Sequence, residues 1–312
     1  MNIITRLATL NDVKSIVDIH CSDIEKWFKE TEGQKVEARY EDLSIEERYI
    51  HGGPWMTTET CAIHLNNLLV NGQYPLVAEL NNRVVGELEL YIGEEKGPLG
   101  RCGYIDILEV HRDYRGRGVG RALINKAIEI ARNQKCQTIA VWPTQEATPF
   151  YIKCGINQTA YIIHQIELDL TKIHPTQETI ETKPIPTNQT PTKTKMHLIT
   201  PRIYTSTAAW LKTQWKYSLQ IPTKTIQGYI ATHKAIYTLQ TKPNNPTTAY
   251  TYLWVKDTKN TKQALNTTIN IAIKTGIKKL RLYITPQTQN HVKYHPHKHL
   301  TTETLLTKKL HK

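Results

Sequence analysis

The amino-acid sequence predicts an α/β protein that does not follow a regular βαβ repeat. Two observations carry this prediction. Apolar residues recur at helical spacing in some segments and gather in short strand-like runs in others. In addition, three of the strand-like runs follow one another with no helix between them, which indicates a meander. The expected order over residues 3–170 is β-α-α-β-β-β-α-β-α-β.

The elements can be justified in chain order. Residues 3–9 read as a strand, and Asn11 or Asp12 is placed to cap a helix over residues 12–28 with apolar residues at helical spacing. Residues 29–56 are acidic and irregular. The remaining expected elements are a helix over 58–70 closed by Asn71-Gly72, a hairpin of strands 74–80 and 83–93 around Asn81-Asn82, a strand over 102–110, a helix over 119–135, a strand over 136–143, a short helix over 146–155 and a strand over 159–170.

Length and charge divide the chain. With 312 residues, two domains are expected, and we place them at residues 1–170 and 201–312, joined by a Pro/Thr-rich linker over 171–200. Residues 1–170 hold 18 Lys and Arg against 24 Asp and Glu, whereas residues 171–312 hold 22 against 4. The basic half invites a nucleic-acid interpretation. However, this half also holds 31 Thr and few of the residues whose codons begin with G, which are Ala, Val, Asp, Glu and Gly. A gene strand poor in guanine therefore explains why Asp and Glu are so few. We do not expect a nucleic-acid partner.

Cysteine usage and hydropathy bear on the compartment. The five cysteines all lie before residue 155, show no CxxC spacing and are odd in number, which favours free thiols in a reducing compartment. No run of about eighteen apolar residues is present. We therefore expect a cytoplasmic protein that does not enter a membrane.

The stretch 109–124, EVHRDYRGRGVGRALI, leaves an expected strand and opens an expected helix. Glycines let a backbone approach a ligand closely, and the start of a helix presents N–H groups and partial positive charge. A pyrophosphate is the natural occupant, with arginines at its rim. The spacing does not fit the G-x-G-x-x-G dinucleotide fingerprint, and the Gly-Lys-Ser/Thr of a P-loop is absent.

These residues resemble a known family. The run Arg115-x-x-Gly118-x-Gly120 is similar to motif A of the GNAT superfamily of acyl-CoA N-acyltransferases, and PFYIKCGI at residues 149–156 is similar to that family's FY segment. Residues 3–20 resemble its first strand and helix. The resemblance covers about residues 1–170 and implies a mixed central sheet with helices on both faces, with acetyl-CoA as cosubstrate.

The resemblance also implies roles for single residues. It places the Val110 N–H where it can polarise the thioester carbonyl, and Tyr151 where a phenol can protonate the departing thiolate. The residues implied to bind the cofactor are Leu108, Glu109, Val110, Arg115, Gly116, Arg117, Gly118, Val119, Gly120 and Arg121. For the base, Tyr104, Asp106, the pair Glu87 and Glu89, and ordered water all remain open. No metal site is expected, because the histidines at 291–299 read as part of a polar tail.

The second half contains a weaker copy of the same pattern. Residues 250–287 parallel residues 103–145 as strand, helix and strand, but the connecting segment KDTKNTKQA has no glycine. We interpret residues 201–312 as a degenerate GNAT-like domain that has lost its phosphate loop.

Two functions remain open at this point. The first is transfer of an acetyl group from acetyl-CoA to a primary amine, on a small cationic molecule or on a protein. The acidic and aromatic residues between 27 and 59 could line a cleft for such a cation, or could form a solvated face. The second is a CoA-sensing or nucleic-acid-associated binding protein with little turnover. The oligomeric state is not predicted.

Overall fold

The computed structural model describes residues 2–31, 33–175, 181–200, 203–215, 224–242 and 245–310. The chain divides into two compact units, which we describe separately. Unit 1 comprises residues 1–92, 105–134 and 215–221, and unit 2 comprises residues 93–104, 135–214 and 222–312. In the ranges described, no helix combines the length and the apolar character needed to cross a membrane.

Unit 1 is built on strands in the order β1-β4-β5-β6, with β1 antiparallel to β4 and β4 antiparallel to β5. The hairpin between β4 and β5 turns at Asn81 and Asn82, both with positive φ (51° and 61°), as the asparagine pair predicts. Its elements are β1 (Ile3–Leu7), α1 (Val13–Cys21), β2 (Trp27–Thr31), β3 (Gln34–Ala38), α2 (Ile45–Gly52), α3 (Thr58–Val70), β4 (Tyr74–Leu80), β5 (Arg83–Glu94), the later part of β6 (Arg101–Val110) and α4 (Val119–Asn133).

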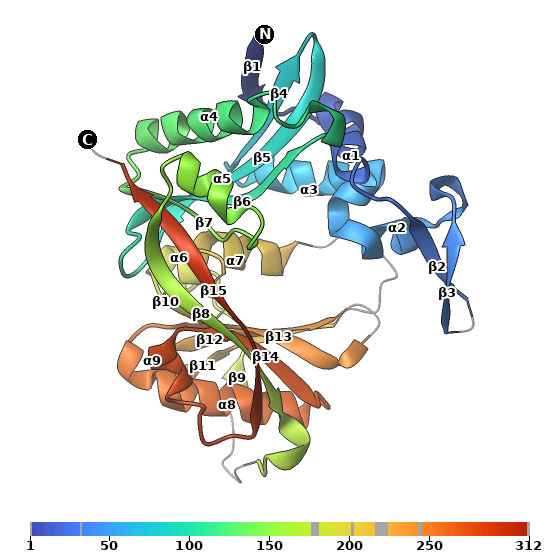
Figure 1. The fold of residues 1–312 in the computed structure, drawn as a ribbon. Helices are drawn as coiled ribbons and strands as arrows, with labels where there is room; N and C mark the ends of the chain where they lie inside the picture. Colours follow the sequence, from blue (N-terminus) through green and yellow to red (C-terminus); the bar gives the residue numbers. More distant parts are fainter. Residues whose placement is uncertain are drawn as a thin grey trace. The chain divides into compact units, whose positions relative to one another are not determined.

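Helices cover both faces of this sheet (Figure 1). On one face, α1 and α3 pack against β4 in an apolar cluster that includes Val17, Leu65 and Val77. On the other face, α4 packs its apolar stripe, with Val119 and Leu123 almost fully buried. Because side chains alternate along β5, its residues face α4 and the α1–α3 pair in turn.

Two expectations for unit 1 were wrong. The helix expected over residues 12–28 ends at Cys21, and Trp27 begins strand β2. The stretch expected to be irregular forms the β2–β3 hairpin and helix α2, which Ser44 and Glu47 cap reciprocally. The hairpin escaped prediction because neither face is buried, so its sequence shows no apolar alternation.

Unit 2 contains strands in the order β7-β15-β8-β14-β13-β12-β11-β9, and β10 also pairs with β13. Its sheet is mixed, because β13 and β14 are parallel while the other recorded pairs are antiparallel. Its elements are β7 (Thr138–Val141), α5 (Thr148–Lys153), β8 (Gln158–Asp169), β9 (Thr182–Lys183), α6 (Pro191–Thr194), β10 (His197–Thr200), α7 (Ser206–Gln214), β11 (Thr225–Ile230), β12 (Ala235–Lys242), β13 (Asn245–Val255), α8 (Thr261–Lys274), β14 (Lys279–Ile284), α9 (Pro286–Gln289) and β15 (His297–Lys309).

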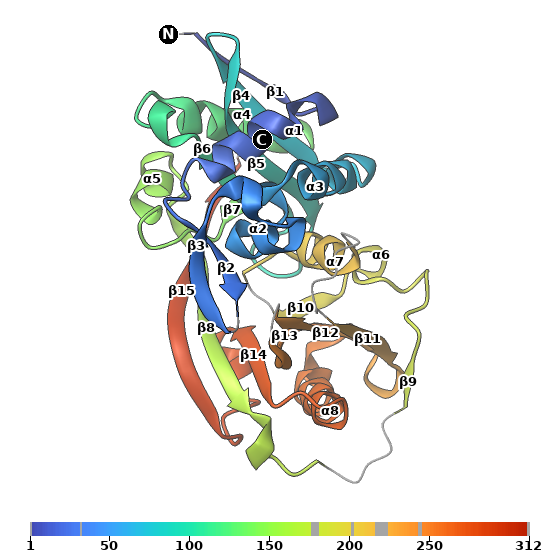
Figure 2. The same cartoon turned by 90° about the vertical axis from the view of Figure 1, so that its right-hand side faces the viewer.

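Unit 2 is also covered on both faces. Along β13, Leu253 and Val255 pack in the cluster that includes α8, which Figure 2 shows beside the strands, whereas Tyr252 and Trp254 pack in the cluster that includes α7. The succession β13, α8, β14 has the strand–helix–strand order that the sequence predicts for residues 250–287, with its two strands parallel.

The segment expected to be a linker, residues 171–200, holds regular structure towards its end. Residues 191–194 form α6 and residues 197–200 form β10, where Leu198 and Ile199 are buried in unit 2. Residues 176–180 lie outside the described residues. The division of the chain into domains at residues 170 and 201 stays a prediction.

Candidate functional site

The candidate site begins where β6 ends and a glycine-containing turn leads into α4. Gly116 and Gly118 have φ of +74° and +86°, a left-handed backbone that side chains with a Cβ rarely adopt. Gly118 is the residue before the first turn of α4. The first four N–H groups of an α-helix have no partner within the helix, so this turn presents several donors together.

A third glycine, Gly86 on β5, brings α4 close to the sheet. A Cβ placed at Gly86 would lie 2.7 Å from Val119 Cγ1 and 3.1 Å from Leu123 Cδ1. Both are nearer than side-chain carbons normally approach. The missing side chain therefore allows the first turn of α4 to rest directly on β5, which positions the turn that precedes it.

Arg115 ties the turn to its surroundings. Its Nε donates to the Val110 carbonyl at 3.0 Å, and its Nη2 donates to Glu109 Oε1 at 2.7 Å and also pairs with Asp23, just beyond α1. The planar guanidinium is suited to such multiple acceptors. The Val110 N–H, which we expect to face the thioester, donates to Glu109 Oε1 at 3.1 Å. The structure thus brings Glu109, Val110 and Arg115 together.

Arg117 and Arg121 differ from Arg115 in their environment. Both are exposed, and neither forms an ion pair with a carboxylate in the part of the chain that the structure describes. Arg117 lies over the ring of Tyr114, with 5.2 Å from its Cζ to the ring centroid. These two cations are therefore available to an anion at the turn.

The predicted catalytic residues lie in different places. Tyr151 is buried in α5 of unit 2. Tyr104 is also buried and belongs to unit 2, where its hydroxyl donates to the Ile203 carbonyl at 2.5 Å. Asp106 is half-buried on β6 and belongs to unit 1, as does the glycine turn. Their catalytic roles stay predictions, and the bond to Ile203 gives Tyr104 a structural use.

Two histidine–carboxylate pairs lie on the face of β5 opposite Gly86; His64 and both carboxylates are buried, and His20 is partly exposed. His20 Nε2 lies 2.6 Å from Glu87 Oε2, and His64 Nε2 lies 2.7 Å from Glu89 Oε1. Trp55 joins the pairs, because its Nε1 donates to Glu89 Oε1 at 2.9 Å and its ring stacks on His20 at 5.2 Å. The two glutamates are among the residues that the sequence analysis leaves open for the base, whereas neither histidine was predicted.

A signal for the histidines was present in the sequence. His20 follows Val13, Ile16 and Val17 on one stripe of α1, and His64 lies at helical spacing from Cys61 and Leu68 on α3. A histidine on an apolar stripe must find a partner when it is buried. The partners are 67 and 25 residues away in the chain, so spacing alone could not identify them.

Burial and charge both act on the His20–Glu87 pair. Burial by itself lowers the pKa of His20, but the hydrogen bond to Glu87 and the charges of Glu87, Glu109 and Glu89 outweigh it, and the pKa of His20 is raised. Burial raises the pKa of Glu87, against the opposing effect of His20. Both groups of the pair therefore have pKa values above their ordinary ones.

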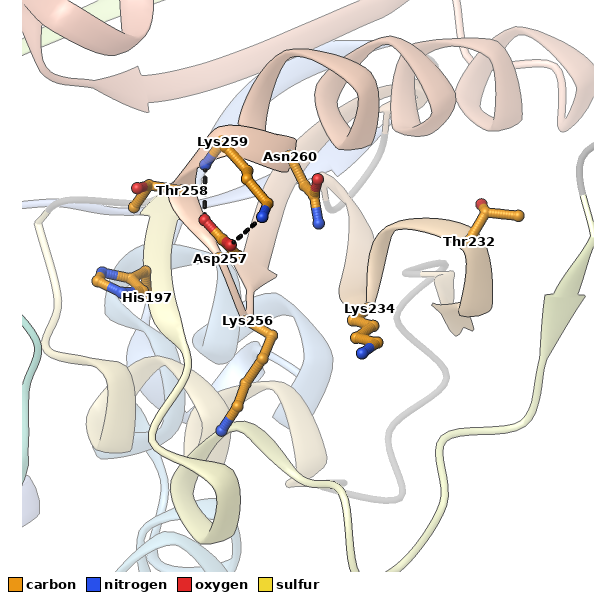
Figure 3. Close-up of a pocket in the computed structure, with 8 residues that line it drawn as sticks. All are labelled: His197, Thr232, Lys234, Lys256, Asp257, Thr258, Lys259 and Asn260. Atoms are coloured by element: carbon orange, nitrogen blue, oxygen red, sulfur yellow. Dashed lines mark hydrogen bonds and ion pairs between the residues drawn. The ribbon is translucent and has the colours of Figure 1, made fainter.

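The corresponding turn of unit 2 is chemically different. Between β13 and α8 lies a pocket of about 400 Å³, lined by the residues drawn in Figure 3: His197, Thr232, Lys234, Lys256, Asp257, Thr258, Lys259 and Asn260. Asp257 Oδ1 accepts from the Lys259 N–H at 3.1 Å, and its other oxygen pairs with Lys259 Nζ at 3.1 Å. A carboxylate of the protein thus accepts from the Lys259 N–H, a backbone donor at the position where a glycine turn would face a ligand.

The acidic and aromatic residues between 27 and 59 mostly make local contacts. Lys26 pairs with Glu37 at 3.0 Å, and Arg39 pairs with Asp42 at 2.9 Å, all four being exposed. Of the aromatic residues in this stretch, Trp55 is the one that reaches the buried histidine–carboxylate pairs. This arrangement favours a solvated face for most of the stretch.

Comparison with known proteins identifies the fold and a family match for part of the chain. Residues 26–156 match the sequence model of the Acetyltransferase (GNAT) family. A GCN5-related N-acetyltransferase from Anabaena variabilis superposes with a TM-score of 0.65 at 12% identity, over 99% of this chain and 73% of that one. Another, from Kribbella flavida, gives a TM-score of 0.58 at 13% identity, over 99% and 71%. At such identities the likeness shows the fold, which is that of GNAT proteins.

Two curated relatives are more similar in sequence over shorter stretches. Glucosamine 6-phosphate N-acetyltransferase from Trypanosoma brucei brucei is 35% identical over 89 residues, 28% of this chain and 58% of that protein. Glucosamine 6-phosphate N-acetyltransferase 1 from Oryza sativa subsp. japonica is 38% identical over 56 residues, 18% of this chain and 34% of that protein. The chain therefore spans between a third and three fifths of these relatives. The match to the Acetyltransferase (GNAT) family thus covers residues 26–156 of this chain.

Proposed function

We propose that this protein is an acetyl-CoA-dependent N-acetyltransferase that transfers the acetyl group directly to a primary amine. The observation that carries the proposal is the left-handed glycine turn between Val110 and α4, with Arg117 and Arg121 exposed beside it. The GNAT match over residues 26–156 and the N-acetyltransferase names of the relatives support it.

The residues at the turn fit the pyrophosphate of acetyl-CoA. Gly116 and Gly118 keep the backbone open, the N–H groups at the start of α4 are donors, and Arg117 and Arg121 supply charge. Arg115 holds the turn in place through its bonds to Val110 and Glu109. Bound acetyl-CoA would supply an activated acetyl group, as a thioester whose carbonyl carbon can accept an amine.

The acceptor is proposed to be a primary amine, on a small cationic molecule or on a protein. Glu87 lies in the interior of unit 1 beside His20, and its carboxylate favours a positive charge in that vicinity. The acceptors of the two curated relatives are amino sugars by name, and an amino sugar is one member of this class. In the second unit, we propose that the turn at Asp257 does not bind acetyl-CoA, because the Asp257 carboxylate lies in the turn, where it bonds the Lys259 N–H and would repel a pyrophosphate.

The proposal is tested by calorimetry with acetyl-CoA and by release of free thiol across a panel of amines. The variant Gly118→Asp adds a carboxylate at the turn and strains a residue with φ of +86°. The matched control is Gly276→Asp, since Gly276 has φ of +84° and nothing within 4 Å of an added Cβ. Both changes should cost similar stability, about 1 kcal/mol, but only Gly118→Asp should abolish acetyl-CoA binding.

The outcomes separate the candidate functions. Binding of acetyl-CoA together with thiol release on an amine supports the transferase. Binding without release on any amine would favour the CoA-sensing alternative. Equal affinity of wild type and Gly118→Asp for acetyl-CoA would refute the glycine turn as the cofactor site.

A further inference from the structure

We propose that His20, oriented by Glu87, accepts the proton that the acceptor amine must lose before it attacks. The inference deepens the proposed function and rests on it. His20 lies in the last turn of α1, with 10% of its side chain exposed, while the Glu87 side chain is only 2% exposed. His20 can therefore exchange protons with a ligand, and Glu87 reaches that ligand through the imidazole.

The last turn of α1 is fixed beside the end of β6. Ser22 Oγ accepts from the Arg112 N–H at 3.1 Å, and Asp23 pairs with Arg115. These partners lie two and five residues after Val110, whose N–H is expected to face the thioester. His20 is two residues before Ser22, and the charge of Glu109 acts on it directly. These bonds place the end of α1, which carries His20, beside the end of β6, where the thioester carbonyl is expected.

The geometry also selects the ring nitrogen that acts. When His20 Nε2–H donates to Glu87, the lone pair of the neutral ring lies on Nδ1, which can accept a proton. Glu87 fixes the tautomer and stabilises the imidazolium that forms. The stacked ring of Trp55 restricts the orientation of the imidazole.

Neighbouring histidines are less suited to this role. His64 is 3% exposed and its partner Glu89 is fully buried and also bonded to Trp55, so this pair is closed to ligands. His111 Nδ1 already accepts from the Asp113 N–H at 3.3 Å. His20 alone among these three combines a buried carboxylate partner with an accessible ring.

The proton balance is simple. His20 Nδ1 removes one proton from the acceptor ammonium, which frees the nitrogen lone pair. The new C–N bond forms at the acetyl carbonyl carbon, and the C–S bond breaks with its electron pair on sulfur. The second proton of the attacking nitrogen goes to the thiolate, which leaves as CoA, and His20 returns its proton to solvent.

The pH dependence follows from the charges that face this pair. Glu87 and Glu89 from β5 and Glu109 from β6 raise the pKa of His20, while His64 from α3 acts on Glu87. A base works when it is deprotonated, so kcat/KM should rise with pH through the pKa of His20, above its ordinary 6.5. Removing the Glu87 charge should move this rise to lower pH.

The test compares full-length wild type with His20→Gln and Glu87→Gln, using acetyl-CoA, the best amine of the panel and thiol release from pH 5 to 10. The controls are His51→Gln, whose ring bonds the Phe28 backbone, and Glu79→Gln, whose carboxylate bonds Arg6. We expect His20→Gln to lower kcat about 100-fold with unchanged affinity for acetyl-CoA. It should also lose the acidic limb of the pH profile, that is, the rise of kcat/KM with pH. Glu87→Gln should shift the limb to lower pH, and the controls should follow wild type.

Each outcome decides the question. A His20→Gln variant with wild-type kcat and an unchanged acidic limb would overturn the proposal while leaving the transferase activity intact. If His20→Gln does not fold, the position of the limb in Glu87→Gln decides, since the amide keeps the shape of the carboxyl group. Wild type that binds acetyl-CoA but acetylates no amine overturns the proposed function and this inference with it.

Discussion

The contact between Gly86 and the start of α4 allows a quantitative prediction. In Gly86→Ala, the added Cβ would lie 2.7 Å from Val119 Cγ1 and 3.1 Å from Leu123 Cδ1. Val119 is 1% exposed and Leu123 is fully buried, so neither has room to withdraw. The start of α4 must therefore move away from β5.

The magnitude follows from two opposing effects. Overpacking a core by one methyl group costs about 1–3 kcal/mol. Replacing glycine by alanine at negative φ restricts the unfolded chain and returns about 0.4–1 kcal/mol. We expect Gly86→Ala to lower the free energy of unfolding by about 1–2 kcal/mol. Acetyl-CoA should also bind more weakly, because Val119 is the first residue of the helix that follows the glycine turn.

The assay is urea denaturation followed by circular dichroism, with calorimetry for acetyl-CoA. The double variant Gly86→Ala/Val119→Ala removes the clashing methyl groups and should be more stable than the sum of the two single changes predicts, by about 1 kcal/mol. Wild-type stability in Gly86→Ala, together with additivity in the double variant, would refute the close packing described for this contact.

Three further predictions concern other contacts. Arg115→Lys should weaken acetyl-CoA binding in calorimetry, because an ammonium cannot reproduce the bonds that the guanidinium makes to three acceptors; unchanged affinity would argue against its anchoring role. The pKa of Asp12 is lowered, because the bonds from Arg6 outweigh burial, so its contribution to stability is present above its ordinary pKa of 3.8 and is lost as pH falls below it. Asp12→Asn should therefore flatten the acid side of a plot of unfolding free energy against pH, and a curve parallel to wild type would contradict this. Trp254→Phe removes the 3.0 Å bond from Nε1 to Ser206 Oγ in the buried part of unit 2 and should cost about 1–3 kcal/mol in thermal or urea unfolding; a neutral change would show that the bond contributes nothing.

The sequence predicted the elements that bury many apolar residues. Helix α4 and the β4–β5 hairpin were predicted because their apolar residues face a core and their turn residues are chemically distinctive. The β2–β3 hairpin was not, because none of its described residues is fully buried and its apolar residues do not alternate with polar ones. The end of α1 was misplaced because no glycine or proline marks it in the sequence. The Ser22 hydroxyl, which donates to the Ile19 carbonyl at 2.6 Å, lies at this end of the helix.

The site shows the same division between local and distant information. The glycine turn is a local pattern, since its φ angles require glycine at positions 116 and 118. The partners of His20 on α1 and His64 on α3 both lie on β5, so only the folded chain brings acid and base together. The ion pair between Arg115 and Asp23 likewise joins residues 92 positions apart in the chain, so it could not be predicted from local sequence spacing.

The position of β15 has a consequence for producing parts of this protein. Strand β15 lies between β7 and β8, and β8 has β14 on its other side, so its two neighbours both come from beyond residue 278. A fragment that stops at residue 170 would expose both edges of β8 and one edge of β7. Open edges of this kind pair with other chains. Residues 1–170 expressed alone should therefore aggregate, and folded material should require synthesis through residue 309.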